Sequence, residues 1–162
     1  MNGQGEKLRK ILGLILIAVS VAVAIFLFLG THKQRVSLDE PFKVEDPYAR
    51  VFGASATAGA AFMHITNQSG QDDVLLGAKA GASAMTELHT HIEDKDGVVK
   101  MRQIEGGIKL ASGETVVMER GGNHVMMMGL NKSFEVGEIV KITLIFEKAG
   151  DVFVEAPVDN NR

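Results

Sequence analysis

The 162-residue chain contains no cysteine and no tryptophan, and only one tyrosine. Without cysteine it has no disulfides, thiolate metal sites or blue-copper centres, and every mechanism that needs a cysteine is excluded. Its lysines and arginines do not gather into a basic patch, and the formal net charge is -3. Nothing therefore indicates a nucleic-acid-binding surface. Eight methionines, many for so short a chain, supply all of its sulfur.

One long apolar run lies near the N-terminus. Residues 11–29 contain no charged side chain, and a helix of this length would extend roughly 28 Å, close to the thickness of a bilayer's hydrocarbon core. Basic residues flank the run on both sides, so the charge asymmetry is small. Its position near the N-terminus favours a cytosolic N-terminus and an exported remainder, as for signal sequences and signal anchors. A cleaved signal peptide is the alternative, but "FLFLGTHK" lacks a small-x-small cleavage pattern. We predict a short cytoplasmic segment, residues 1–10, and an uncleaved transmembrane signal anchor, residues 11–29.

The rest of the chain has the pattern of one all-β domain. We expect a polar linker over residues 30–43, a domain over residues 44–158 and a tail over residues 159–162. Short β-like runs at about ten-residue spacing, separated by Gly, Asn and Asp, predict a Greek-key β-sandwich or barrel. These runs are Ala60–Thr66, Val74–Ala80, Met85–Ile92, Val98–Ile104, Glu114–Arg120, His124–Leu130, Glu138–Glu147 and Val152–Val158.

The stretch "GGNHVMMMGL" combines a histidine with three methionines. Residues i and i+2 of a strand project from the same face, so His124 and Met126 point the same way and could share a metal ion. Met127 faces the opposite side and is expected to fill the core. Met128 returns to the ligand face, but roughly 13 Å along the strand from His124 it is too far away to join directly.

A second pair of this kind is His89 and His91 in "ELHTH". The turn "EDKDG" follows, and then a run that contains Met101. A hairpin here would bring Met101 towards the face of His89. The acidic turn residues Asp94 and Asp96 are expected to form a solvated hairpin tip rather than a site for a hard cation.

Two histidines and two methionines make a definite chemical hypothesis. Thioethers are soft, neutral ligands that favour Cu(I), and imidazole suits either oxidation state of copper. Such a site needs no thiol and would survive in an oxidising, exported compartment. From the spacing alone, a methionine-rich core with surface or structural histidines, as expected for His32 and His64, explains these residues equally well.

The segments around these pairs have a family likeness. "DPYARVFGASATAGAAFMHITN", "DDVLLGAKAGASAMTELHTH" and "GVVKMRQIEGGIKLASGETVVMERGGNHVMMMGL" resemble the PCu(A)C (PCuAC) family of exported bacterial copper chaperones. The family's motif is a histidine, a methionine after about eleven residues, and His-x-Met about twenty-one residues later. His89 and Met101 have 11 residues between them, and His124 and Met126 follow after 22. We place the one extra residue in the loop at Gly106 and Gly107.

The resemblance implies a cupredoxin-like β-sandwich that binds Cu(I) through His89, Met101, His124 and Met126. It also implies delivery of copper to the copper centres of cytochrome c oxidase during assembly, directly or through a partner. Family members are commonly released to the periplasm by a cleaved signal, whereas this chain has the pattern of a tethered one. His91 is an extra imidazole, which leaves open whether His89, His91 or both bind.

We therefore expect a copper chaperone rather than an enzyme, held in the bacterial cytoplasmic membrane by a single pass with its domain on the periplasmic side. Its expected partners are the copper ion and a copper-accepting assembly factor or oxidase subunit. A periplasmic copper-tolerance or storage protein and a metal-free scaffold are the alternatives. A copper oxidase or redox enzyme is a further one, against which the lack of cysteine argues.

Overall fold

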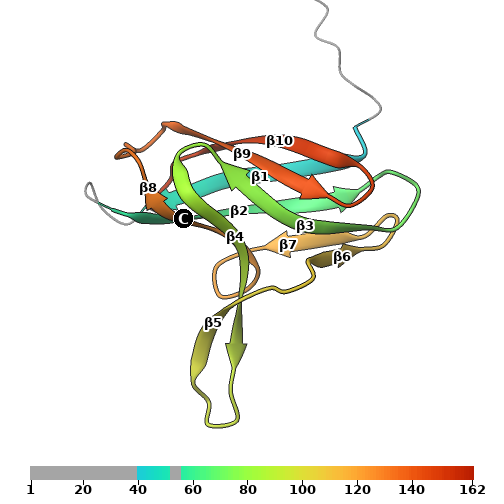
Figure 1. Ribbon diagram of the computed structural model, residues 1–162, viewed down its shortest axis with the longest axis horizontal. Coiled ribbons are helices and arrows are strands. Elements are labelled where there is room, and N and C mark those ends of the chain that lie inside the picture. The colour runs from blue at the N-terminus through green and yellow to red at the C-terminus, as the bar shows by residue number, and fades with distance from the viewer. Residues whose placement is uncertain (1–39, 52–55) are drawn as a thin grey trace, which may run out of the picture. The chain divides into compact units, whose positions relative to one another are not determined.

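The computed structural model describes residues 40–51 and 56–162. They form ten strands, and this part of the chain contains no helix that could cross a membrane (Figure 1). The predicted all-β class is therefore confirmed for these residues. The predicted anchor, residues 11–29, lies outside them, so the membrane tether stays a prediction.

The ten strands form two antiparallel sheets. The larger sheet has the order β1–β2–β8–β4–β5, with β7 also paired to β2, and the smaller has the order β10–β9–β3–β6. Both sheets join strands that are distant in the sequence, as Greek-key connections do. The strands are β1 (Phe42–Val51), β2 (Ala58–Asn67), β3 (Asp73–Ala80), β4 (Ser83–Glu93), β5 (Val99–Gln103), β6 (Ile108–Leu110), β7 (Thr115–Met118), β8 (His124–Leu130), β9 (Ile139–Phe146) and β10 (Gly150–Pro157).

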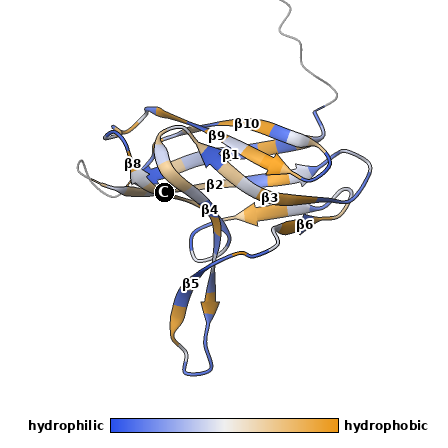
Figure 2. Cartoon of the chain, in the orientation of Figure 1, coloured by the Kyte–Doolittle hydropathy of each residue, from blue (hydrophilic) through white to orange (hydrophobic). Residues whose placement is uncertain are grey.

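The core lies between the two sheets, because side chains from both belong to one buried cluster. Alternate residues of the central strands supply it: Met63 and Ile65 of β2, and Ile142 and Leu144 of β9, are at most 1% exposed. Figure 2 shows apolar segments on the strands of both sheets and a polar tip on the β4–β5 hairpin. Burying each such side chain stabilises the fold by about 1.5–3 kcal/mol relative to leaving it exposed.

The first strand begins at Phe42, inside the segment that the sequence predicts as a linker. Phe42 is fully buried and stacks on Phe146 of β9, with ring centres 3.7 Å apart. The two aromatic rings thus join the larger sheet to the smaller one at the first residue of β1.

The last four residues, predicted as a tail, lie against β1. The amide of Asp159 donates to the carbonyl of Ala49 at 2.9 Å, and the amide of Val51 donates to the side chain of Asn160 at 2.9 Å. The guanidinium of Arg162 lies 4.1 Å from the ring centre of Tyr48 and pairs with Asp46. Through these contacts the C-terminal residues cover β1, the strand at one edge of the larger sheet.

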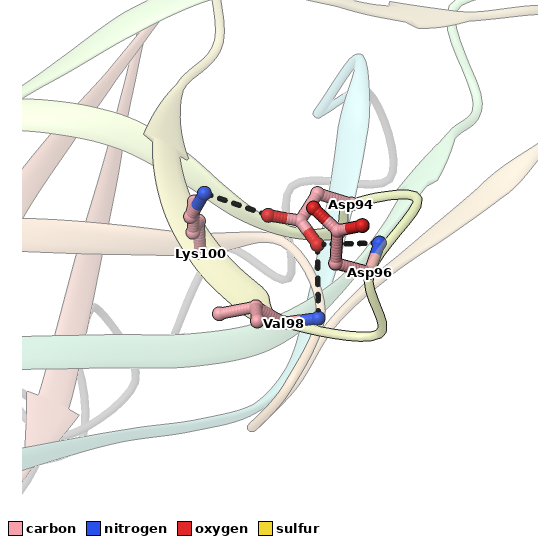
Figure 3. Close-up of polar contacts among 4 residues, drawn as sticks. All are labelled: Asp94, Asp96, Val98 and Lys100. Carbon is pink, nitrogen blue, oxygen red and sulfur yellow. Dashed lines mark hydrogen bonds and ion pairs between the residues drawn. The ribbon is translucent and has the colours of Figure 1, made fainter.

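The β4–β5 hairpin extends past the sandwich (Figure 1). At its tip Asp94 accepts hydrogen bonds from the amides of Asp96 and Val98, each at 3.0 Å, and pairs with Lys100 at 2.6 Å (Figure 3). The Lys100 hydrogen bond, followed by that from Val98, lowers the pKa of Asp94. The carboxylate is therefore occupied by its own turn, and the predicted hairpin tip is confirmed.

Candidate metal centre

The predicted ligands lie on the outer face of the larger sheet, where β8 runs between β2 and β4. The inner face of the same strands is occupied by core residues, since Leu88 and Val125 are 3% and 0% exposed. Met127 is also fully buried on that inner side, as predicted. The alternation of the strands therefore separates packing residues from candidate ligands.

The register of three strands brings the two halves of the motif together. His89 of β4 lies directly opposite His124 of β8. On the other side of β4, His91 lies opposite Met101 of β5, whereas His89 lies opposite Gln103. The hairpin thus brings Met101 to the histidine face, as predicted, and makes His91 its direct cross-strand neighbour.

Two imidazole rings lie beside the ring of His124. The ring centre of His124 lies 5.9 Å from that of His89 and 5.3 Å from that of His91. On its third side lies Phe62 of β2, with ring centres 6.1 Å apart. The site thus has an apolar wall on the β2 side and two further imidazoles on the β4 side.

His124 is held with one nitrogen free. Its ring Nδ1 donates to the carbonyl of Gly122 at 3.0 Å, which leaves Nε2 with its lone pair. The side chain is 2% exposed. Burial lowers the pKa of His124 and the neighbouring His91 and His89 lower it further, while the Gly122 hydrogen bond partly offsets them. The ring is therefore neutral at neutral pH, the form that binds a metal ion.

His89 is oriented by a carboxylate. Its Nε2 donates to Glu87 at 2.8 Å, so Nδ1 is the nitrogen that a metal ion would meet. Among the described residues this buried Nδ1 has no hydrogen-bond partner, and neither has that of His91. Leaving a buried polar atom unsatisfied costs about 1–3 kcal/mol. Metal-binding histidines commonly donate their second nitrogen to a carboxylate or a backbone carbonyl, as His89 and His124 do here.

The turn before β8 is built from glycine. Gly121 has a φ of 84°, a conformation that residues with a side chain rarely adopt. The amide of Gly122 donates to the carbonyl of Glu119 at 3.1 Å, which closes the turn. The diglycine thus forms the turn that leads into His124, and the Gly122 carbonyl also orients the imidazole.

A hollow of about 550 Å³ is lined by three of the four predicted ligands, Met101, His124 and Met126, and by His91, whereas His89 does not line it. Met101 is 44% exposed at its rim, on a strand whose residues are all exposed. Met128 does not line the hollow, in agreement with the prediction that it lies too far along β8. The lining residues are Arg50, Ala60, Phe62, His91, Met101, Arg120, Gly121, His124 and Met126.

Comparison with known proteins places this domain in a family. The LpqE-like family, described as "Putative lipoprotein LpqE-like", matches residues 42–158. The chain belongs to the LpqE-like family. A relative from Leifsonia xyli, "Putative lipoprotein Lxx21020", is 28% identical over 116 residues, which are 72% of this chain and 68% of that protein.

Solved PCuAC structures have the same fold as this LpqE-like domain. The copper-bound PCuAC domain from PmoF2 is 28% identical with a TM-score of 0.60, over 74% of this chain and 93% of that one. The Cu(I) form of DR1885 from Deinococcus radiodurans is 29% identical with a TM-score of 0.59, over 81% of this chain and 87% of that one. The resemblance to PCu(A)C proteins seen in the sequence is therefore confirmed, and with it the cupredoxin-like fold.

The histidine and methionine side chains on this face of the LpqE-like domain limit which metal ion it can bind. In residues 40–51 and 56–162 no three His, Cys, Asp or Glu side chains form a preformed cluster for a metal ion. A metal site on this face must therefore recruit thioether sulfur, or the rings must turn towards one another. Sulfur ligands of this kind suit Cu(I) much better than zinc, magnesium or calcium.

Several residues of the site are missed by reasoning from the sequence. Glu87 carries a usable signal, since it stands two residues before His89 and shares its strand face. Arg50, Phe62 and Arg120 carry none, because they reach the hollow from β1, from β2 and from the β7–β8 turn respectively. The pairing of β1 with β2 and of β2 with β8 brings Arg50 and Phe62 to the side of His124, and the turn before β8 brings Arg120 there.

Proposed function

We propose that this LpqE-like chain is a copper carrier that binds Cu(I) through His89, Met101, His124 and Met126. The observation that carries the proposal is the convergence of both motif halves on one face, with uncommitted lone pairs on Nδ1 of His89 and Nε2 of His124. Each of these rings already donates its other nitrogen to an oxygen, as metal-binding histidines do.

The ligand chemistry selects the oxidation state. Two imidazoles and two thioethers are all neutral, so bound Cu(I) would carry a single positive charge into a partly buried site. The names of two similar structures state copper for the PCuAC domain of PmoF2 and Cu(I) for DR1885. This agrees with a Cu(I) cargo for the present chain.

Transfer rather than catalysis fits the exposure of the ligands. Met101 is 44% exposed on β5, the outermost strand of its sheet. An incoming thiolate or thioether from an acceptor could replace Met101 first, while His124, 2% exposed, still holds the ion. Copper would then pass between proteins by ligand exchange without release of a free ion.

The destination we propose is the copper centre of cytochrome c oxidase, reached directly or through an assembly factor. Relatives described as lipoproteins suggest that the chain is exported and held at a membrane. This chain has no cysteine to carry a thioether-linked lipid, so residues 11–29 would serve as the anchor instead. Tethering near a membrane-embedded acceptor would raise the carrier's effective concentration there.

A competition titration tests the copper site. The full chain, kept in detergent micelles, competes for Cu(I) with a chromogenic chelator, and we compare wild type with Met101→Ala/Met126→Ala. The double variant should bind Cu(I) at least about a hundredfold more weakly, because both soft ligands are gone. Equal competition by the two proteins would show that the proposed site is wrong.

The matched control is a second pair of methionines on the same face. Met85 of β4 lies directly opposite Met128 of β8, and neither residue lines the hollow. Met85→Ala/Met128→Ala removes two thioethers as well, but it should leave the Cu(I) affinity within about threefold of wild type. A large loss in the control would mean that the chain binds copper through methionines in general.

A further inference from the structure

We propose that His91 is a third imidazole ligand, so that the same hollow holds Cu(II) through three ring nitrogens in addition to Cu(I). The inference rests on the copper function proposed above. It adds a fifth ligand and a second oxidation state of the cargo to that function.

His91 is at least as well placed as His89. It lines the hollow together with Met101, His124 and Met126, whereas His89 does not. It lies directly opposite Met101 in the β4–β5 register. Its Nδ1 is buried and has no hydrogen-bond partner among the described residues. A buried ring nitrogen left unsatisfied beside a hollow is suited to a cation that enters it.

The ring separations allow one ion to be shared. An ion about 2.0 Å from a ring nitrogen lies about 3.2 Å from the ring centre, so two imidazoles on one ion have centres no more than about 6.4 Å apart. The ring centre of His124 lies 5.3 Å from that of His91 and 5.9 Å from that of His89. Both separations are within this limit.

The three rings are not yet closed around a point, since the described residues hold no preformed cluster of three such ligands. Two of the rings have a fixed second nitrogen: His124 donates to Gly122 and His89 donates to Glu87. Because the ring centres already lie within the limit for one shared ion, bringing the three nitrogens onto that ion requires rotation of side chains. His91 and His89, on one face of β4, lie roughly 6.6 Å apart at their Cα atoms, near enough for both rings to turn towards His124.

The third imidazole changes which oxidation state the site can hold. Cu(II) favours nitrogen ligands, and thioethers add little to its binding, so two imidazoles alone make a weak Cu(II) site. Charged side chains near the hollow act in both directions. Arg50 and Arg120 line it and would repel a dication, whereas the Glu87 carboxylate, which contacts His89, would attract one. A third nitrogen ligand would then decide whether Cu(II) is retained.

The test counts nitrogen ligands. We use the full chain in detergent micelles with His32→Gln and His64→Gln, so that every remaining imidazole belongs to the site, and compare it with the same protein carrying His91→Gln. One equivalent of Cu(II) is added at about pH 6.5, where the terminal amine is mostly protonated. Electron paramagnetic resonance then reports the number of bound imidazole nitrogens, and competition titrations report the Cu(II) and Cu(I) affinities.

We expect three bound imidazole nitrogens in the background protein and two after His91→Gln, with Cu(II) affinity lower by at least about tenfold. The loss of Cu(I) affinity in the variant should be smaller than its loss of Cu(II) affinity, because the two thioethers still hold Cu(I). Denaturant unfolding like that of the background protein shows that the variant is folded. The same nitrogen count and the same Cu(II) affinity in both proteins would overturn the proposal.

The two levels of the hypothesis fail differently. If the background protein binds Cu(I) tightly but takes up no Cu(II), the role of His91 is wrong and the Cu(I) carrier stands. If it binds neither ion, the copper function itself is wrong, and the role of His91 falls with it.

Discussion

His124 lies directly opposite His89 across the β4–β8 pair, and their ring centres are 5.9 Å apart. The two residues are separated by 34 others in the chain. Three strands, β5, β6 and β7, lie between them in the chain. Any metal site that uses both imidazoles therefore depends on the folded sheet, so copper binding through it should be lost when the domain unfolds.

The Glu87–His89 hydrogen bond gives a prediction about orientation. Removal of the carboxylate by Glu87→Ala frees the His89 ring to turn, and the loss of such a partner commonly weakens metal binding by about 10- to 100-fold. We expect a Cu(I) affinity lower by that factor in a chelator competition. Glu93→Ala is the control, because Glu93 is exposed on the same strand at the hairpin tip. If both variants bind Cu(I) like wild type, Glu87 does not orient a ligand.

Two adjacent methionines should have opposite roles. Met127 is fully buried in the core, so Met127→Ala should lower the free energy of unfolding by about 2–5 kcal/mol. The folded variant should still bind Cu(I) like wild type. Met126, on the opposite face, lines the hollow, and Met126→Ala should weaken Cu(I) binding with a much smaller loss of stability. Denaturant unfolding and Cu(I) competition on both variants decide the matter, and a reversed pattern would mean that the faces are misassigned.

The carboxylate of Asp73 should make stability depend on pH. It is 3% exposed and accepts hydrogen bonds from the amides of Val74, Lys148 and Ala149 at 2.7–2.9 Å. Burial alone would raise the pKa of Asp73, but these three donors outweigh it and hold the pKa below its ordinary value of 3.8. A lowered pKa means that the unfolded chain takes up the proton first, so this stabilisation is complete above about pH 4 and is lost as the pH falls further.

Asp73→Asn isolates this contribution. The amide cannot accept all three hydrogen bonds, so we expect the free energy of unfolding at neutral pH to be lower by about 1–3 kcal/mol. The difference between variant and wild type should shrink as the pH falls below about 4, because the wild-type carboxyl then becomes neutral as well. Denaturant unfolding at several pH values measures it. A difference that stays constant down to acid pH would contradict a role for the charge.

The local pattern of apolar and polar residues was sufficient to predict much of the fold. The bounds of His124–Leu130 agree with β8, and strict alternation placed Met127 in the core, since side chains of a strand point to opposite faces. β6 was not predicted, because Ile108–Leu110 is only three residues long and depends on pairing with β3. No run was predicted for β1 either, whose first residue, Phe42, is fixed by stacking on Phe146, 104 residues away.

The candidate site was predicted only in part. Spacing identified the histidine and methionine pairs and their faces, since that follows from the period of a strand. It left His89 and His91 equivalent, because both stand on one face of β4. The difference between them comes from their neighbours: His89 has Glu87 and lies opposite His124, while His91 lies opposite Met101 beside the hollow.

The sequence by itself determined the all-β class, the absence of thiol chemistry and the soft, neutral character of the candidate ligands. These follow from composition and from a period of two residues, which act over a few positions of the chain. Only the tertiary structure decided that His124 would be buried against Phe62, that His89 would be its partner across the sheet, and that His91 would line the hollow. Those relationships depend on the register between strands far apart in the chain, and register is set by the fit of whole faces to one core.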